Sequence, residues 1–171
     1  MRPGLTLLVL AVLALTGCAT GATDDPTKEP DVDDRPTMET VVARYAQLRE
    51  DLFRELGRRF GERPWAESAN SRGMGRSGCN EVEEGEHVHL PGMSFRGTYA
   101  PEDWDRVRRV VEEVGARHGF VEVAVVTDEP GNLHLVAEDD LGARMQFGMA
   151  RNTTFGLRTG CHRWERTPPM P

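Results

Sequence analysis

The feature that most constrains the fold is a repeating apolar pattern over residues 38–60. Apolar side chains recur there at spacings of three and four residues, at Met38, Val41, Val42, Tyr45, Leu48, Leu52, Leu56 and Phe60. This period matches one face of an α-helix, and Arg and Glu fill the opposite face. Thr37 is a suitable N-cap, and Gly61 and Pro64 are stop signals. The segment therefore predicts a long amphipathic helix whose apolar face packs against another layer.

A second, shorter helix is predicted after residue 100. Pro101 fits its first turn, and the acids that follow favour the positive end of the helix dipole. Its apolar stripe ends at Gly119 and consists of Trp104, Val107, Val111 and Val114. Strands are predicted at residues 87–96, interrupted by Pro91-Gly92, and at 120–127, 133–137, 143–150 and 153–158.

These elements predict an α+β domain over residues 37–165, with a disordered tail at 166–171. The strands follow one another at hairpin spacing, so we expect an antiparallel sheet of about four or five strands with two helices packed on one face. Residues 66–86 are rich in Gly, Ser and Asn and predict a flexible loop. The glycines between Arg72 and Gly78 do not form a phosphate-binding loop, because they lack a preceding strand, a Lys-Ser/Thr ending and a following helix.

The N-terminal segment predicts export and lipidation. A cationic tip with Arg2 precedes an apolar run over residues 5–15, and Leu15-Thr16-Gly17-Cys18 follows. The run is too short to cross a hydrocarbon core about 30 Å thick, which needs about 20 helical residues. It is typical of a secretory signal over residues 1–17, and the tetrad resembles the bacterial lipobox. We expect cleavage before Cys18 and acylation of its thiol; a cleaved, soluble secreted protein is the alternative.

Residues 18–36 predict a disordered tether that starts at the lipidated cysteine. Asp, Thr and Pro dominate this stretch, and such a composition cannot offset the entropy of ordering. A flexible chain of this length would hold the domain about 20 to 25 Å from the membrane. The net charge of the whole chain is -7, which argues against nucleic acid as a partner. The expected location is the extracytoplasmic face of the cell membrane, with an envelope protein or ligand of unknown identity as partner.

Two cysteines remain when Cys18 is set aside. A pair in an exported chain favours a disulfide between Cys79 and Cys161, which would close a loop of about 80 residues and stabilise the fold by up to about 4.5 kcal/mol. The alternative is a nucleophilic Cys161 beside His162. Neighbours on a strand point to opposite faces, so His162 is poorly placed to activate Cys161.

Metal binding is a second alternative for this chain. His87 and His89 would share one face of a strand and could supply half of a metal site, with His134 or an acid as a further ligand. The acids Glu138, Asp139 and Asp140 could hold a divalent cation, although a hairpin tip rich in Asp needs no such explanation. No ligand spacing fixes a complete site, so the sequence predicts no cofactor.

Several short motifs resemble a known family. They are Cys79, the run Met93-Ser94-Phe95-Arg96-Gly97-Thr98-Tyr99 leading into Pro101-Glu102-Asp103-Trp104, the helix end Arg117-His118-Gly119, and Thr159-Gly160-Cys161. In this order they are similar to the LppA-like lipoproteins of mycobacteria and related actinobacteria. The resemblance covers about residues 37–161. It implies an envelope lipoprotein with a disulfide-linked domain, and it implies no activity.

Two hypotheses about function follow. The first is a non-catalytic binding or adaptor domain, because no serine triad, redox Cys-x-x-Cys motif or glycosidase-type pair is evident. The second is a metal-binding or metal-dependent hydrolytic lipoprotein that uses His87 and His89. The second hypothesis requires these side chains to converge with acids in a cleft.

Overall fold

The computed structural model describes residues 34–79 and 84–166. The predicted signal segment 1–17, Cys18, most of the predicted tether and the tail from residue 167 lie outside the described residues. Two α-helices are described, α1 (Met38–Phe60) and α2 (Trp104–Arg117), and a 3-10 turn, η2 (Pro101–Asp103), precedes α2. The described strands are β1 (Ala66–Glu67), β2 (Gly75–Gly78), β3 (Glu86–His89), β4 (Met93–Arg96), β5 (Glu122–Glu129), β6 (Asn132–Glu138), β7 (Arg144–Met149) and β8 (Asn152–Arg158). In this part of the chain, no helix is long and apolar enough to cross a membrane.

The long helix forms where its periodicity predicts. The hydroxyl of Thr37 accepts a hydrogen bond from the backbone N–H of Thr40, and the helix ends at Gly61 with a φ of 84°. Glycine adopts this left-handed φ without the steric cost that other residues incur. Most of the predicted stripe is buried: Met38, Val41, Tyr45, Leu48, Leu52 and Leu56. The second predicted helix and its buried stripe are likewise confirmed.

The antiparallel sheet is confirmed, but the expected number of strands is wrong. Eight strands form one sheet within the described residues, in the order β1-β4-β8-β7-β6-β5, and β3 connects the hairpin β2–β3 to β8. Pro91-Gly92 separates β3 from β4, and the expected flexible loop contains β1 and β2. These two strands have little apolar character of their own. They form because β4 and β3, respectively, supply the pairing backbone, which local composition does not reveal.

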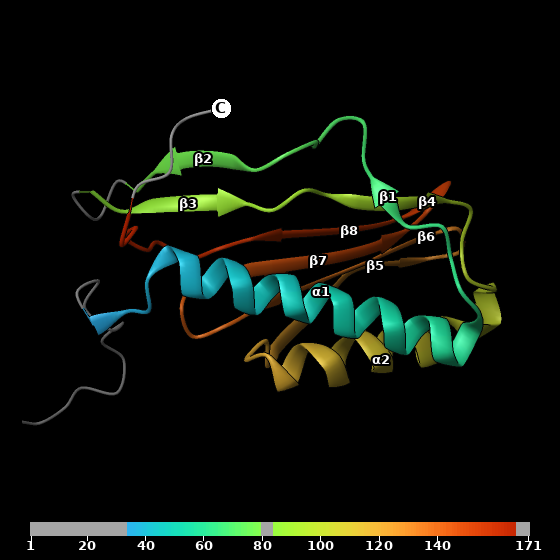
Figure 1. The fold of residues 1–171 in the computed structure, drawn as a ribbon. Helices are drawn as coiled ribbons and strands as arrows, with labels where there is room; N and C mark the ends of the chain where they lie inside the picture. The colour runs from blue at the N-terminus through green and yellow to red at the C-terminus, as the bar shows by residue number, and fades with distance from the viewer. Residues whose placement is uncertain (1–33, 80–83, 167–171) are drawn as a thin grey trace, which may run out of the picture.

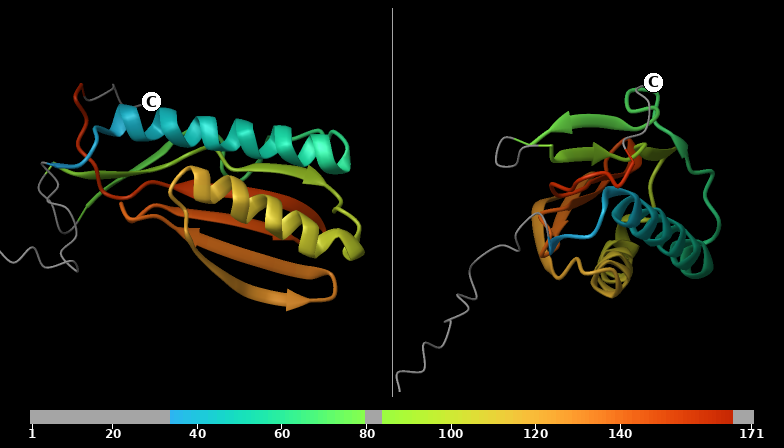
Figure 2. Two further views of the ribbon diagram at one scale, coloured as in Figure 1. Left: turned by 90° about the horizontal axis from the view of Figure 1, so that it is seen from below. Right: turned by 60° about the vertical axis from the view of Figure 1, so that its left-hand side comes forward.

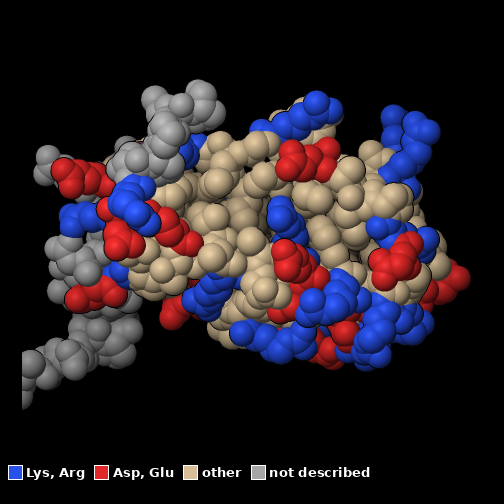
Figure 3. All heavy atoms as spheres, in the orientation of Figure 1, with Lys and Arg blue, Asp and Glu red and all other residues tan. Residues whose placement is uncertain are grey.

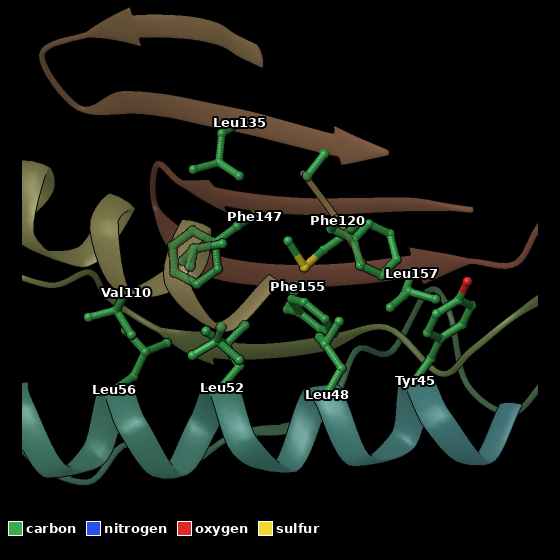
Figure 4. Close-up of a cluster of buried hydrophobic side chains, with 14 of the residues drawn as sticks. Tyr45, Leu48, Leu52, Leu56, Val110, Phe120, Leu135, Phe147, Phe155 and Leu157 are labelled. Atoms are coloured by element: carbon green, nitrogen blue, oxygen red, sulfur yellow. The ribbon is translucent and has the colours of Figure 1, made fainter. Parts of the chain in front are cut away.

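The core lies between α1, α2 and the sheet. Leu48, Leu52 and Leu56 project from α1 toward Phe147 and Phe155 of the sheet, and all five are buried (Figure 4). Trp65, which follows α1, stacks on Phe53 with ring centroids 4.1 Å apart. The first layer is thus formed by the apolar stripes of α1 and α2, and the second by the inward-facing residues of the strands.

The sheet curls around α1, and the helices cover one of its faces (Figure 2, right). The opposite face, here called the outer face, carries the alternate residues of each strand. The solvent side of the helices is covered with interleaved Arg and acidic side chains (Figure 3). Many of them form ion pairs, such as Arg59 with Glu55 and Glu113.

The domain is elongated along α1, which is about 34 Å long at 1.5 Å per residue. We call the end near Thr37 and the end of β8 the proximal end, because the described chain enters there (Figure 1). The distal end contains Phe60 of α1, the β5–β6 turn at Pro130-Gly131 and the β7–β8 turn.

Replacing Leu52 by Ala tests the packing between α1 and the sheet. We expect the free energy of unfolding to fall by about 2–5 kcal/mol, because a fully buried leucine leaves a cavity that relaxes only partly. Val121→Ala is the matched control, since this side chain is 71% exposed, and it should change the value by less than about 0.5 kcal/mol. Urea unfolding followed by circular dichroism measures both; equal effects would contradict the assignment of the core.

Candidate functional site

The predicted disulfide is confirmed. Cys79 and Cys161 are bonded, with Cα atoms 6.1 Å apart and a sequence separation of 82. The bond joins the end of β2 to the segment that follows β8. The neighbouring backbone reinforces this junction, because Glu86 and His162 exchange two hydrogen bonds of 2.9 and 3.0 Å. Cys161 is therefore a structural residue and not a free thiol nucleophile.

A charged and aromatic cluster holds the β2–β3 hairpin on the same segment. Arg76 donates two hydrogen bonds to the Glu86 carboxylate, at 2.7 and 2.9 Å, and the Trp164 indole donates a third at 2.8 Å. The Arg76 guanidinium also lies 5.2 Å from the centre of the Trp164 ring. The bonds from Arg76 hold the pKa of Glu86 below its usual value. This carboxylate therefore holds Arg76 and Trp164 together and has a structural role.

Within the described residues, the histidines proposed as a metal site do not converge with further ligands. His87 and His89 do share a face of β3, and His87 Nδ1 lies 3.2 Å from the carbonyl oxygen of Thr159. His89 pairs in register with Arg158, and the loss of solvent together with this cation lowers the pKa of His89. His134 lies on β6, three strands away and displaced toward the distal end, which places it about 20 Å from His89.

Asp139 in the predicted acid cluster has a structural role. Its carboxylate accepts a hydrogen bond from the Tyr45 hydroxyl and two more from the backbone N–H groups of Leu141 and Ala143, at 3.0 and 2.8 Å. Burial and the adjacent carboxylate raise the pKa of Tyr45. The acid thus caps the β6–β7 turn and joins it to α1. In the described part of the chain, no group of three or more His, Cys, Asp or Glu side chains could hold a metal ion.

The proximal end is closed by residues that sequence reasoning did not select. His162 is fully buried, and its Nδ1–H donates to the Pro36 carbonyl at 2.9 Å. Arg35 donates to the carbonyls of Leu141 and Cys161, at 3.3 Å each. Gly160 is required here, because a Cβ at this position would lie 1.7 Å from the Leu141 carbonyl oxygen. The start of the described chain is therefore pinned beside the disulfide.

The outer face of the sheet presents side chains in rows that run across the strands. One row is polar and consists of Ser94, Thr154, Gly148, His134 and Thr127, in register on β4, β8, β7, β6 and β5. A second row contains Gln146, Val136 and Ala124. A third is charged and contains His89, Arg158, Arg144, Glu138 and Glu122.

Apart from Ser94, the residues of the polar row line a hollow of about 380 Å³ near the distal end. Gly148 keeps its floor open, because a Cβ there would come within 3.2 Å of Thr154 Oγ1 and 3.6 Å of His134 Cδ2. Hydroxyl, imidazole and amide groups surround this floor, and Arg151 lies at its edge. Such groups can hydrogen-bond a polar ligand.

This fold is an α+β sandwich of helices on an antiparallel sheet, and two solved structures share it. The lipoprotein LppA from Mycobacterium tuberculosis aligns with a TM-score of 0.66 at 12% identity, over 81% of this chain and 89% of the other. A DUF4853 family protein from Actinomyces odontolyticus aligns with a TM-score of 0.57 at 16% identity, over 81% of this chain and 75% of the other. Among curated proteins, none matches the sequence.

The family model LppA, described as a lipoprotein confined to pathogenic Mycobacterium, matches residues 19–165. The chain therefore belongs to the LppA lipoprotein family, as its motifs indicated. The match begins immediately after Cys18 and covers the whole described domain. The family description names no activity.

Removing the disulfide should destabilise the domain. For the double variant Cys79→Ala/Cys161→Ala we expect the free energy of unfolding to fall by about 2–5 kcal/mol, because a cross-link over 82 residues restricts the unfolded chain. Reduction of the protein without substitutions should lower the free energy of unfolding by a similar amount. Reduction of the double variant should not change its free energy of unfolding. A reduced protein as stable as the oxidised one would contradict a structural role.

His162 should make stability fall as pH decreases. Burial lowers the pKa of His162 in the folded state, whereas an unfolded histidine titrates near 6.5, so the unfolded state binds more protons just below that pH. Stability from this group is complete above about pH 7 and declines toward the lowered pKa by up to about 1.4 kcal/mol per pH unit. His162→Asn retains an N–H donor for Pro36 but cannot titrate. It should flatten the decline in the free energy of unfolding between pH 7.5 and 5.5, measured by urea unfolding; an unchanged slope in His162→Asn would contradict the assignment.

Proposed function

We propose that this protein is a lipid-anchored component of the cell envelope whose domain acts by binding and not by catalysis. The observation that carries the proposal is the tetrad Leu15-Thr16-Gly17-Cys18, which lies directly before the segment that matches a lipoprotein family. In this proposal residues 1–17 are removed, and the Cys18 thiol becomes a thioether to a diacylglyceryl group. Two or three acyl chains give stable anchoring, whereas one chain alone is marginal.

The way the chain joins the domain supports this arrangement. Hydrogen bonds from Arg35 and to Pro36 tie the chain to the proximal end. About 16 residues then separate Cys18 from the pinned segment, and a flexible chain of that length spans about 20–25 Å. The proximal end would face the outer surface of the cytoplasmic membrane, and the distal hollow would face away from it.

A binding role is supported by the difference between the two faces of the sheet, since the helices cover only one of them. The inner face is filled by the helices, and the buried titratable side chains of Asp139 and His162 bond to other parts of the domain. The outer face carries polar rows that no described helix covers. A metal-dependent hydrolase would instead require His87 and His89 to meet acids in a cleft, and no observation on the described residues favours it.

The Cys18→Ser variant tests the anchor. We expect the protein without substitutions in the detergent-extracted membrane fraction, because its acyl chains partition into lipid. The Cys18→Ser variant should carry no acyl chains, so its intact mass should contain no added lipid. Thr23→Ser, outside the tetrad, is the matched control and should behave like the unmodified protein. Equal partitioning and equal mass of the Cys18→Ser variant and the control would contradict lipidation at Cys18.

A further inference from the structure

We propose that the free edge of β5, at residues 121–125, binds an extended basic segment of another protein by strand addition. In that segment apolar side chains alternate with Arg or Lys. The inference names the partner chemistry of the proposed binding function. It rests on the domain being a binding module, and it does not depend on the lipid anchor.

The backbone of β5 is available on one side. β5 lies at the end of the strand order and, within the described residues, pairs only with β6. With eight residues it is a long edge, whereas β1 at the other end of the order has two. Figure 2 (left) shows β5 as the outer strand of its hairpin. Every second residue of such a strand directs its N–H and C=O groups away from the sheet, where an added strand can bond them.

Exposed valines accompany this free backbone. Val121 is 71% exposed and Val125 is 39% exposed, and both lie on the helix side of the sheet with the half-buried Val123. Of the four exposed large apolar side chains in the described residues, three lie in or beside β5. Apolar side chains of an added strand would cover this row and remove it from water.

A bulge sets the length of the docking segment. The register with β6 shifts between Val125 and Thr127, so Val126 is the extra residue. Bulges interrupt regular pairing and protect edges from uncontrolled association. A partner strand therefore pairs with the regular part before the bulge, about five residues long.

The charged row of the outer face ends in an acid at the free edge, and this favours a basic partner. In this row Arg144 pairs with Glu138, Nε to Oε1 at 3.9 Å, and Glu138 lies directly opposite Glu122 on β5. Like charges directly opposite each other are unfavourable. Glu122 is the last member of the row, at the free edge. An Arg or Lys on an added strand would lie beside Glu122 and give it an opposite charge.

The segment that contains the edge is acidic, although Arg44 donates to the carbonyl of His118 and Arg144 pairs with Glu138. Residues 118–143 contain six Asp or Glu and no Lys or Arg, in contrast to the interleaved charges on the helices (Figure 3). A second copy of the chain would bring the same acids to the edge, and its Glu122 would lie diagonally across from the first. The preceding segment of this chain, residues 19–33, has five acids and one lysine. Electrostatic repulsion thus disfavours both a second copy of the chain and residues 19–33 as occupants of the edge, and attraction favours a basic segment.

The test uses the full-length protein in detergent and a fluorescent peptide, Arg-Val-Arg-Val-Arg-Val-Arg. We expect saturable binding by fluorescence anisotropy at about 20 mM salt, weakening as salt screens the charges. A peptide with Glu in place of Arg should not bind. The basic peptide with methylated alternate backbone nitrogens should bind at least about tenfold more weakly, because the methyl groups block strand pairing without changing charge.

Variants of exposed residues locate the site. Glu122→Lys should weaken binding at least about tenfold, and Val121→Ser should also weaken it, while Glu50→Lys makes the same charge change on α1 and should stay within about twofold. Equal losses for Glu122→Lys and Glu50→Lys, or no effect of backbone methylation, would overturn the proposal in favour of unspecific attraction. A dimer in light scattering that Val121→Ser dissociates would overturn it in favour of a second copy, and absence of saturable binding would overturn it outright.

Discussion

The packing of one helix stripe into the curve of the sheet is the contact on which the other parts of this domain depend. Leu48, Leu52 and Leu56 are fully buried against sheet residues such as Phe147 and Phe155. Short strands with few apolar residues cannot form a stable sheet alone. The Gly- and Ser-rich hairpin β2–β3 is retained because β3 pairs with β8 and because Cys79 is bonded to Cys161. The apolar stripe of α1 therefore stabilises the central sheet, and the disulfide stabilises the β2–β3 hairpin at its edge.

Three kinds of structural contact lie close together at the proximal end. Asp139 joins the β6–β7 turn to α1 through Tyr45, His162 and Arg35 hold the start of the described chain, and Gly160 permits the close approach of two backbone segments. Asp139 accepts from Tyr45 and from two backbone N–H groups, and His162 and Arg35 donate to backbone carbonyls, so each of them holds two parts of the domain together. If the chain is anchored at Cys18, as proposed, the tether joins the domain at this end. The disulfide and the hydrogen bonds of Arg35 and His162 hold the chain there.

Sequence reasoning recovered the helices, the longer strands and the disulfide because each has a local signal: a period of three and four, an alternating strand, or an isolated cysteine pair. It missed β1 and β2, since strands made of Ala, Glu, Gly, Arg and Ser form only by pairing with a neighbour. It also considered His87 and His89 as ligands, but the register that separates them from His134 is a property of the whole sheet. The burial of His162 and the exposure of Val121 likewise depend on which elements meet, and no pattern within a few residues encodes that.

Membership of the LppA family, the open outer face and the pinned proximal end agree with an anchored binding domain. We propose that Cys18 bears the lipid, and the disulfide between Cys79 and Cys161 stabilises the fold. Intact-mass analysis of protein extracted from native membranes, alkylated before and after reduction, tests both assignments. We expect a chain that starts at Cys18 with added acyl mass, and two thiols that react only after reduction. A chain without lipid, or one whose thiols react before reduction, would contradict it.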